Sequence, residues 1–245
     1  RDRPGNLPER LAQASERGWS LLTILADGPT WWRDPAVFRY FDRLADDGFL
    51  EAFDRVVFYG AGVAGYAAAA YSIAAPGAEL VLVSPRATAD PALTGWDRRL
   101  RRARRLDFRG GYGFAPDLTE SAARVWLIHD PLHPSDAMHA ALFHRPWVTP
   151  LHARHTGEGT EDTLAELNAL EPILDAAMAG SLTEALFARL WRGRRSNGSY
   201  LRALLAAARL SGHPAREAAI CRNVTARLNA PRFARRLEEL TAGMD

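Results

Sequence analysis

Apolar positions along the chain follow two patterns, short continuous runs and helical spacing. Continuous runs rich in β-forming residues predict five buried strands, at 20–26, 55–59, 79–84, 123–129 and 148–153. Helical spacing predicts intervening helices at 8–17, 34–50, 65–75 and 136–143. Strands that alternate with helices indicate an α/β fold, with a mostly parallel sheet of about five strands and helices on both faces.

The last third of the chain has no strand pattern. From Glu161 onward, apolar spacing predicts helices only, at 163–178, 182–190, 200–210, 215–228 and 231–240. We therefore predict a core domain over residues 1–158 and a helical extension over residues 159–245 that packs on it. Pro150 lies in the fifth predicted strand, where it should shorten the strand or place it at an edge of the sheet.

The junction between the second predicted strand and its helix, residues 56–70, is the most informative stretch. An apolar run ends at a cluster of small residues, and an alanine-rich helix begins at once. Two chemistries use such a tight turn. One is the dinucleotide motif G-x-G-x-x-G, which Gly60, Gly62 and Gly65 match. The other is the nucleophile elbow G-x-S-x-G, in which Gly62 stands where the serine would be.

The dinucleotide interpretation makes the chain an NADP-binding oxidoreductase. A pyrophosphate would lie over residues 62–65 at the start of the helix. An NAD site needs an acidic residue after the next strand, and this chain has Arg86 there, which suits an NADP phosphate instead. Against this interpretation, a strand and a helix precede the turn, whereas the first βα turn of a dinucleotide domain usually carries the motif.

The hydrolase interpretation uses more of the chain. A loop containing Gly28 precedes the turn, where such enzymes place an oxyanion donor. A loop with Asp130 and Asp136 follows the fourth predicted strand, and a loop with His152 and His155 follows the fifth. The order of elbow, acid and histidine is that of the α/β-hydrolase fold.

Three segments carry a resemblance to a known family. Residues 58–68, 83–91 and 129–140 resemble the elbow, the following loop and the acid loop of small α/β-hydrolase-like proteins found beside glycan-modifying genes in proteobacteria. The resemblance covers residues 20–158. The chain is also similar to a bacterial set sometimes labelled phosphoadenosine phosphosulfate reductase. Reductases of that name use an SGG-type nucleotide loop and a cysteine in a Glu-Cys-Gly setting, and this chain has neither.

The resemblance implies a catalytic site whose nucleophile is missing, because Gly62 has no side chain. Asp136, or alternatively Asp130, would pair with His155 and polarise a water. The backbone N–H of Val63 would serve an oxyanion hole. We expect covalent catalysis to be lost, so that the site binds a ligand, hydrolyses it slowly or does no chemistry; the sequence leaves open whether the chain is an enzyme.

Ligand-binding candidates surround this turn. Gly28 and Arg86 lie in loops that should border the pocket, and Trp31 and Trp32 would either line a sugar-sized site or pack as a lid. A run of arginines follows the third predicted strand and comprises Arg98, Arg99, Arg101, Arg102, Arg104, Arg105 and Arg109. Such a run suits an oxyanion ligand. The simpler interpretation is a solvated helix face whose positive charges are balanced by nearby acidic residues.

Composition narrows the function classes. All of the 31 Lys and Arg residues are arginine, which excludes lysine chemistry and is typical of a GC-rich bacterial coding bias. A net charge of only +2 does not favour a nucleic-acid partner. The single cysteine, Cys221, excludes an internal disulfide and is expected to be buried. His152 and His155 lack a third ligand at metal-binding spacing, so no metal is expected.

The chain is expected to be cytoplasmic, because it shows neither a signal peptide nor a membrane span. The resemblance implies a bacterial origin. The predicted function is that of a degenerate α/β-hydrolase-like protein that binds or slowly hydrolyses a small acyl, glycan or anionic substrate without a cofactor. The alternatives are the NADP-binding oxidoreductase and a non-enzymatic binding module. The oligomeric state is not predicted.

Overall fold

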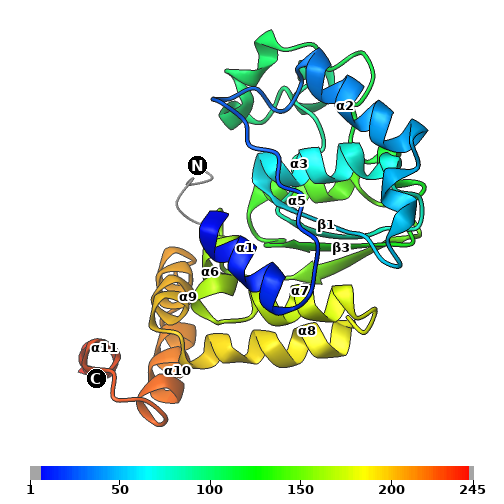
Figure 1. Cartoon of the computed structure of the whole chain (residues 1–245). Helices are drawn as coiled ribbons and strands as arrows, with labels where there is room; N and C mark the ends of the chain where they lie inside the picture. The colour runs from blue at the N-terminus through cyan, green and yellow to red at the C-terminus, as the bar shows by residue number, and fades with distance from the viewer. Residues whose placement is uncertain (1–6, 243–245) are drawn as a thin grey trace. The chain divides into compact units, whose positions relative to one another are not determined.

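The computed structural model describes residues 7–242, with side chains described from residue 11 onward. It divides into two compact units, one up to Thr30 and the other from Trp31 onward (Figure 1). Each unit is described by itself. Among the described residues, no helix is both long and apolar enough to cross a membrane.

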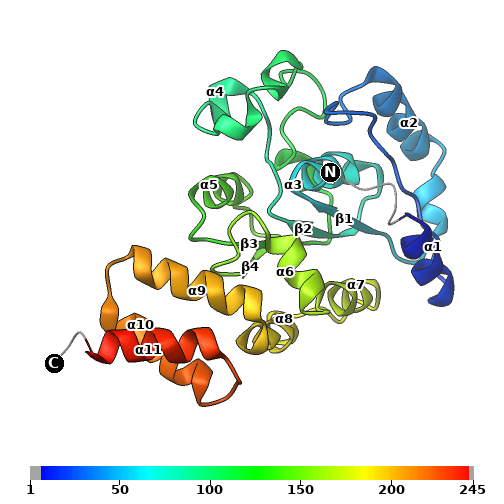
Figure 2. The same ribbon diagram turned by 90° about the vertical axis from the view of Figure 1, so that its left-hand side faces the viewer.

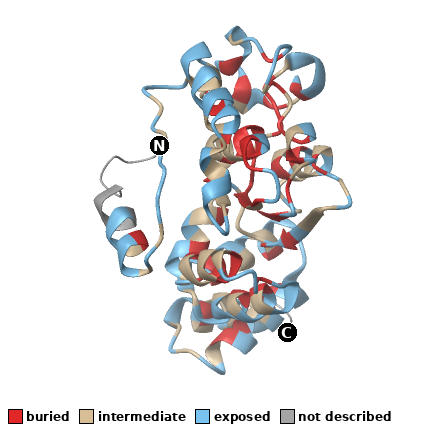
Figure 3. Cartoon of the chain, turned by 45° about the vertical axis from the view of Figure 1, so that its right-hand side comes forward, coloured by how far each residue is buried: buried red, intermediate tan, exposed pale blue. Residues whose placement is uncertain are grey.

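The first unit contains one helix and an extended segment. Helix α1 spans Leu7–Glu16, so it begins and ends one residue before the predicted range of 8–17. The strand predicted at 20–26 is wrong, because this segment forms no strand. Leu21, Leu22 and Leu25 are 42%, 49% and 55% exposed, so the apolar run that predicted a buried strand remains largely in solvent (Figure 3).

The second unit is built on a sheet of four parallel strands, one fewer than predicted. The strands are β1 (Val57–Ala61), β2 (Glu79–Val83), β3 (Arg124–His129) and β4 (Val148–His152), and they lie side by side in chain order. Pro150 lies in β4, which is an edge strand, as predicted. An edge tolerates proline because one side of the strand needs no ladder hydrogen bond.

Helices α3 (Gly62–Tyr71) and α5 (Pro134–Leu142) cover one face of the sheet (Figure 2). Helix α2 (Pro35–Asp46) packs outside α3 through Phe41, whose ring stacks on Tyr71 with centroids 4.2 Å apart. The start of α2 follows from its sequence: Asp34 accepts the N–H of Ala36 at 2.7 Å, and Pro35 fixes the first turn.

Within the part of the chain that the structure describes, six further α-helices follow β4: α6 (Thr160–Glu166), α7 (Leu170–Met178), α8 (Glu184–Trp191), α9 (Gly198–Leu210), α10 (Pro214–Thr225) and α11 (Pro231–Ala242). Their apolar faces share one core with the second face of the sheet. Val81, Trp126 and Ile128 from the strands meet Ile173 and Phe187 from the helices in this core. The C-terminal helices therefore complete the burial of the sheet, whose strands are apolar on both faces.

A long excursion separates β2 from β3. Within it lie the short helix α4 (Pro91–Thr94) and three 3₁₀ turns, at Arg98–Leu100, Ala103–Arg105 and Asp117–Thr119. The arginine run therefore lies on short turns and not on a continuous helix face. Further 3₁₀ turns occur at Phe49–Ala52, Ser72–Ala74 and Arg192–Ser196.

Candidate functional site

The carboxyl ends of the parallel strands bring several polar loops to one edge of the sheet. Ala61 pairs with Val83, which pairs with Ile128, so Gly62, Ser84 and the segment after β3 follow three neighbouring strand ends. The crevice beyond these ends is where open α/β sheets bind their ligands. We therefore take this edge as the candidate site.

The turn between β1 and α3 needs its three glycines for different reasons. At Gly60, a Cβ would lie 2.3 Å from the carbonyl oxygen of Ala64, because the chain doubles back tightly. At Gly65, a Cβ would lie 3.0 Å from the Cβ of Pro85 in the loop after β2. Gly62 has a φ of +56°, and a Cβ added there meets no atom within 4 Å. Position 62 thus combines a left-handed backbone with open space above it.

The first turn of α3 begins at the same edge of the sheet. Ala61 precedes the helix and provides no side-chain cap. The first N–H groups of a helix have no partner within the helix, and they carry the positive end of its dipole. Val63, the predicted oxyanion donor, is the second residue of this turn and is half-buried. The turn therefore offers N–H donors suited to an anion.

Arg86 is tied to this turn. Its backbone N–H donates to the carbonyl of Gly62 at 3.0 Å. Its guanidinium donates to the carbonyl of Ser84 at 3.2 Å and to Asp136 Oδ1 at 2.7 Å. Burial lowers the pKa of Arg86, and the charge of Asp136 opposes this effect. The structure thus brings together two residues, Arg86 and Asp136, that the sequence placed in the site separately.

Asp136 is fully buried near the start of α5. Its Oδ1 atom accepts hydrogen bonds from Arg86 and, at 2.9 Å, from Arg99, and it lies 3.4 Å from Nδ1 of His133. Burial favours the protonated carboxyl, but the charges of Arg86 and Arg99 prevail and lower the pKa of Asp136. Its second oxygen, Oδ2, is buried and has no hydrogen-bond partner. The site therefore contains an ionised carboxylate with one acceptor atom unused.

A second carboxylate, Asp97, anchors the excursion to this cluster. Arg99 donates to both of its oxygens at distances between 2.7 and 3.0 Å, and also to Glu158 at 2.9 Å. Burial raises the pKa of Asp97, but its hydrogen bonds to Arg99 outweigh that effect and bring it to about 2. Arg99 is the member of the arginine run that forms ion pairs with Asp97 and Asp136. The other six arginines of the run are exposed: Arg98, Arg101, Arg102, Arg104, Arg105 and Arg109.

His139 is a structural histidine within the same cluster. Its Nδ1 accepts the backbone N–H of Ala87 at 3.1 Å, so its Nε2 carries the proton and donates to Asp97 at 3.2 Å. Burial lowers its pKa to about 4, which keeps the ring neutral. Both nitrogens are occupied, and His139 holds the excursion against α5.

The acid and the histidine predicted for catalysis are not paired. No hydrogen bond or ion pair joins Asp136 to His155 among the residues that the structure describes. Burial lowers the pKa of His155; the charge of Asp130 opposes this effect, and the charges of Arg154 and Arg194 add to it. The Asp130 carboxylate is itself occupied, since it accepts the N–H groups of Leu132 and Gly157, both at 2.9 Å. Asp136 is instead paired with the guanidinium groups of Arg86 and Arg99.

A chain of hydroxyl groups lies beside Gly62. Ser84 is buried at the end of β2, with a φ of +43°, and its hydroxyl donates to Thr160 at 3.3 Å. Thr160 and Thr156 are joined at 2.8 Å, and Thr156 donates to the carbonyl of Ala153 at 2.8 Å. These bonds link the hydroxyls to one another, and none of them supplies the histidine that would activate a serine nucleophile.

Trp31 belongs to an aromatic core. Trp31 is 5% exposed and packs edge-on against Tyr66 and Phe108, each at 5.3 Å between ring centroids. The backbone carbonyl of Trp32 accepts the hydroxyl of Tyr71. The ring contacts of Trp31 favour the packing interpretation of this residue over the ligand-lining one. Gly28, with a φ of +81°, belongs to the N-terminal unit and is described only there.

Sequence reasoning missed Asp97, Arg99 and His133 as members of the cluster. The excursion has no periodic pattern that would place its side chains, and its fold-back onto α5 is a long-range contact. A usable signal was Asp97 followed by Arg99, since an aspartate that caps a turn often accepts the N–H two residues later, as it does here at 2.9 Å.

Comparisons with known proteins return no match. No protein-family model fits the chain. No curated protein and no solved structure resembles it significantly. Among residues 11–242, moreover, no group of three histidine, cysteine or acidic side chains has an arrangement that could hold a metal ion. The candidate site therefore rests on its own geometry.

Proposed function

We propose that this chain is a degenerate α/β-hydrolase-like protein that binds a small anionic, hydroxyl-bearing ligand at the carboxyl edge of its sheet. The observation that carries the proposal is position 62. It has the left-handed backbone and the open space that an elbow nucleophile requires, yet it is a glycine. Covalent catalysis through this turn is therefore absent.

The order of the strands supports the hydrolase-like interpretation over the dinucleotide one. A dinucleotide binds where the strand order reverses, so that the strands following the motif lie on both sides of it. Here β1 carries the motif at one edge of the described sheet, and β2, β3 and β4 follow successively on the same side.

The chemistry of the ligand follows from the donors and acceptors at this edge. The uncapped N–H groups of α3 and the guanidinium of Arg86 favour a negative charge. The unused oxygen of Asp136 needs a hydrogen-bond donor, such as a hydroxyl group. A sugar acid carries both groups. Any slow hydrolysis would need a water activated by His155 and not a serine.

Isothermal titration with D-glucuronate tests the proposal, with D-glucose and inorganic phosphate as probes that lack the charge or the hydroxyl groups. We expect glucuronate to bind at least about tenfold more tightly than either, since a charge-assisted hydrogen bond contributes about 1.5–3 kcal/mol. Equal or undetectable binding of all three would refute it.

Two variants and a matched control locate the site. Arg86→Met removes the guanidinium, and Val63→Pro removes one N–H donor at a position where a helix tolerates proline. Both should weaken glucuronate binding by about tenfold. Arg145→Met removes an exposed ion pair with Asp117 and should leave binding unchanged. Unaltered binding in both site variants would place the ligand elsewhere.

Hydrolysis is tested separately with 4-nitrophenyl acetate under stopped-flow conditions. Without a nucleophile at position 62, no burst of nitrophenol should precede the steady state. A burst stoichiometric with the protein would show that another residue forms an acyl intermediate and would overturn the loss of covalent catalysis.

A further inference from the structure

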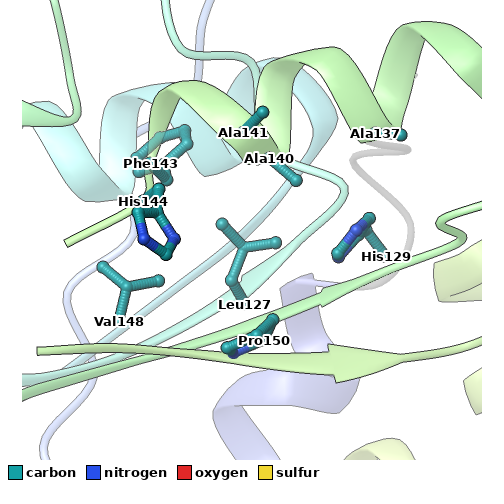
Figure 4. Close-up of a pocket in the computed structure, with 9 residues that line it drawn as sticks. All are labelled: Leu127, His129, Ala137, Ala140, Ala141, Phe143, His144, Val148 and Pro150. Atoms are coloured by element: carbon teal, nitrogen blue, oxygen red, sulfur yellow. The ribbon is translucent and has the colours of Figure 1, made fainter. Parts of the chain in front are cut away.

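A small open-sided pocket lies beneath α5, on the face of the sheet opposite the C-terminal helices. It has a volume of about 210 Å³. Its floor comes from β3 and the edge strand β4, and its roof comes from the second half of α5 and the residues after it (Figure 4). The lining residues are Leu127, His129, Ala137, Ala140, Ala141, Phe143, His144, Val148 and Pro150.

Small side chains on α5 create this space. Ala137, Ala140 and Ala141 face the pocket from the helix, and Leu127 and Val148 face it from the strands. Because alanine ends at Cβ, the helix stands over β4 without filling the gap beneath it. The lining is thus almost wholly apolar, apart from one imidazole at each end, and favours an apolar ligand.

His129 introduces a polar atom that the protein does not satisfy. It is the last residue of β3 and is only 6% exposed. Its Nδ1 atom is buried and has no hydrogen-bond partner. Leaving such an atom unpaired costs about 1–3 kcal/mol, so a ligand that pairs with it would recover free energy. His152 packs edge-on at 5.4 Å between ring centroids and offers no hydrogen bond to this atom.

The imidazole of His129 is suited to a neutral partner. Burial, together with the neighbouring His152, lowers its pKa, so the ring is uncharged at neutral pH. A neutral imidazole accepts at one nitrogen and donates at the other. A hydroxyl group can serve either role, whereas a carboxylate would have to be desolvated without a countercharge.

We propose that this pocket binds a small uncharged molecule made of one apolar ring or short chain and one hydroxyl group, with the hydroxyl bonded to Nδ1 of His129. Its volume fits such a ligand, since an apolar cavity of about 150 Å³ holds one benzene. The site is separate from the anion site proposed at Gly62 and does not depend on it.

The test is a ¹⁹F NMR titration of the chain with 4-fluorophenol and with 4-fluorotoluene, in which a methyl group replaces the hydroxyl. We expect 4-fluorophenol to bind about tenfold more tightly, the contribution of one buried hydrogen bond. Fluorine–proton Overhauser contacts should reach the methyl groups of Leu127 and Val148. Equal affinity for the two probes, or no contact with these methyl groups, would overturn the proposal.

Two variants test separately the hydrogen bond to His129 and the volume of the pocket. His129→Phe should abolish the preference for 4-fluorophenol while keeping an apolar site, and Ala140→Phe should fill the pocket and prevent binding of both probes. His213→Phe alters an exposed histidine that does not line the pocket and should change neither affinity. A preference that survives in His129→Phe, or binding that survives in Ala140→Phe, would refute the assignment.

Discussion

Replacing Gly60 and Gly62 separately with alanine should have very different costs, although both belong to one motif. An alanine Cβ at position 60 would lie 2.3 Å from the carbonyl oxygen of Ala64 and 2.5 Å from its carbonyl carbon. Both atoms are backbone, so no rotamer change relieves the overlap. Overpacking costs about 1–3 kcal/mol when side chains adjust, and here the turn itself must move. We expect a loss of about 3 kcal/mol or more.

Gly62→Ala meets no atom, and its cost is conformational. Holding an L-residue at a φ of +56° costs about 1–2 kcal/mol. Alanine also lowers the conformational entropy of the unfolded chain, which stabilises the fold by about 0.4–1 kcal/mol. The net loss in the free energy of unfolding is therefore about 1 kcal/mol. The two variants should therefore differ by about 2 kcal/mol.

Thermal unfolding followed by circular dichroism measures this difference. For a chain of this size, 1 kcal/mol shifts Tm by about 2–4 °C, so Gly62→Ala should lower Tm by that amount and Gly60→Ala by about 6 °C or more. Gly111→Ala is the control, since a Cβ there also meets no atom and its φ is ordinary. If Gly62→Ala destabilises the protein as much as Gly60→Ala does, the assigned turn geometry is wrong.

Three other predictions concern the polar cluster and the aromatic core. Arg99→Leu should cost about 3 kcal/mol in urea unfolding, because it leaves buried Asp97 and Asp136 with fewer partners, whereas Arg98→Leu at an exposed position should cost under about 0.5 kcal/mol. Asp97 has a folded pKa of about 2, below its unfolded value of about 3.9. It therefore stabilises the fold above pH ~4, and this contribution is lost as the pH falls toward ~2. In Asp97→Asn, the free energy of unfolding should fall less steeply between pH ~4 and ~2. Trp31→Ala should cost about 3–5 kcal/mol and leave the affinity for glucuronate unchanged.

Each of these has a contrary result. Similar losses for the Arg98 and Arg99 variants would mean that the inward position of Arg99 contributes nothing. If the free energy of unfolding falls equally steeply with decreasing pH in Asp97→Asn, other carboxylates cause the acid sensitivity. Weakened glucuronate binding in a stably folded Trp31→Ala protein would restore the ligand-lining interpretation of that residue.

The elements of the sheet were predictable because each is a local pattern. Four of the five predicted strands exist within two residues of their predicted bounds. Four of the five predicted C-terminal helices correspond to α8, α9, α10 and α11, but the single helix predicted at 163–178 is two helices, α6 and α7, separated at Asn168, where φ is +50°. The predicted strand at 20–26 shows the limit of this reasoning. An apolar run has a strand-forming tendency, but it becomes a strand only where another strand offers hydrogen bonds, and this segment forms no such pairing.

The site was predictable in part for the same reason. The glycines at 60, 62 and 65 predict a tight turn, because a Cβ has no room at positions 60 and 65 and the backbone at position 62 is left-handed. Arg86 and Asp136 follow strand ends that a parallel sheet gathers at one edge. Their pairing was not predictable. Whether Asp136 meets His155 or two arginines depends on how the excursion after β2 folds back, and no periodicity in that segment encodes its path.

The sequence by itself determined the α/β class, the tight turn and the absence of a nucleophile at position 62, because these depend on local spacing and on which side chain is present. Tertiary structure alone decided the order of the strands, the occupation of Asp136 by Arg86 and Arg99, and the pocket beneath α5. Those features arise from contacts between residues far apart in the chain, where packing and the burial of charge select one arrangement among several that the local sequence permits.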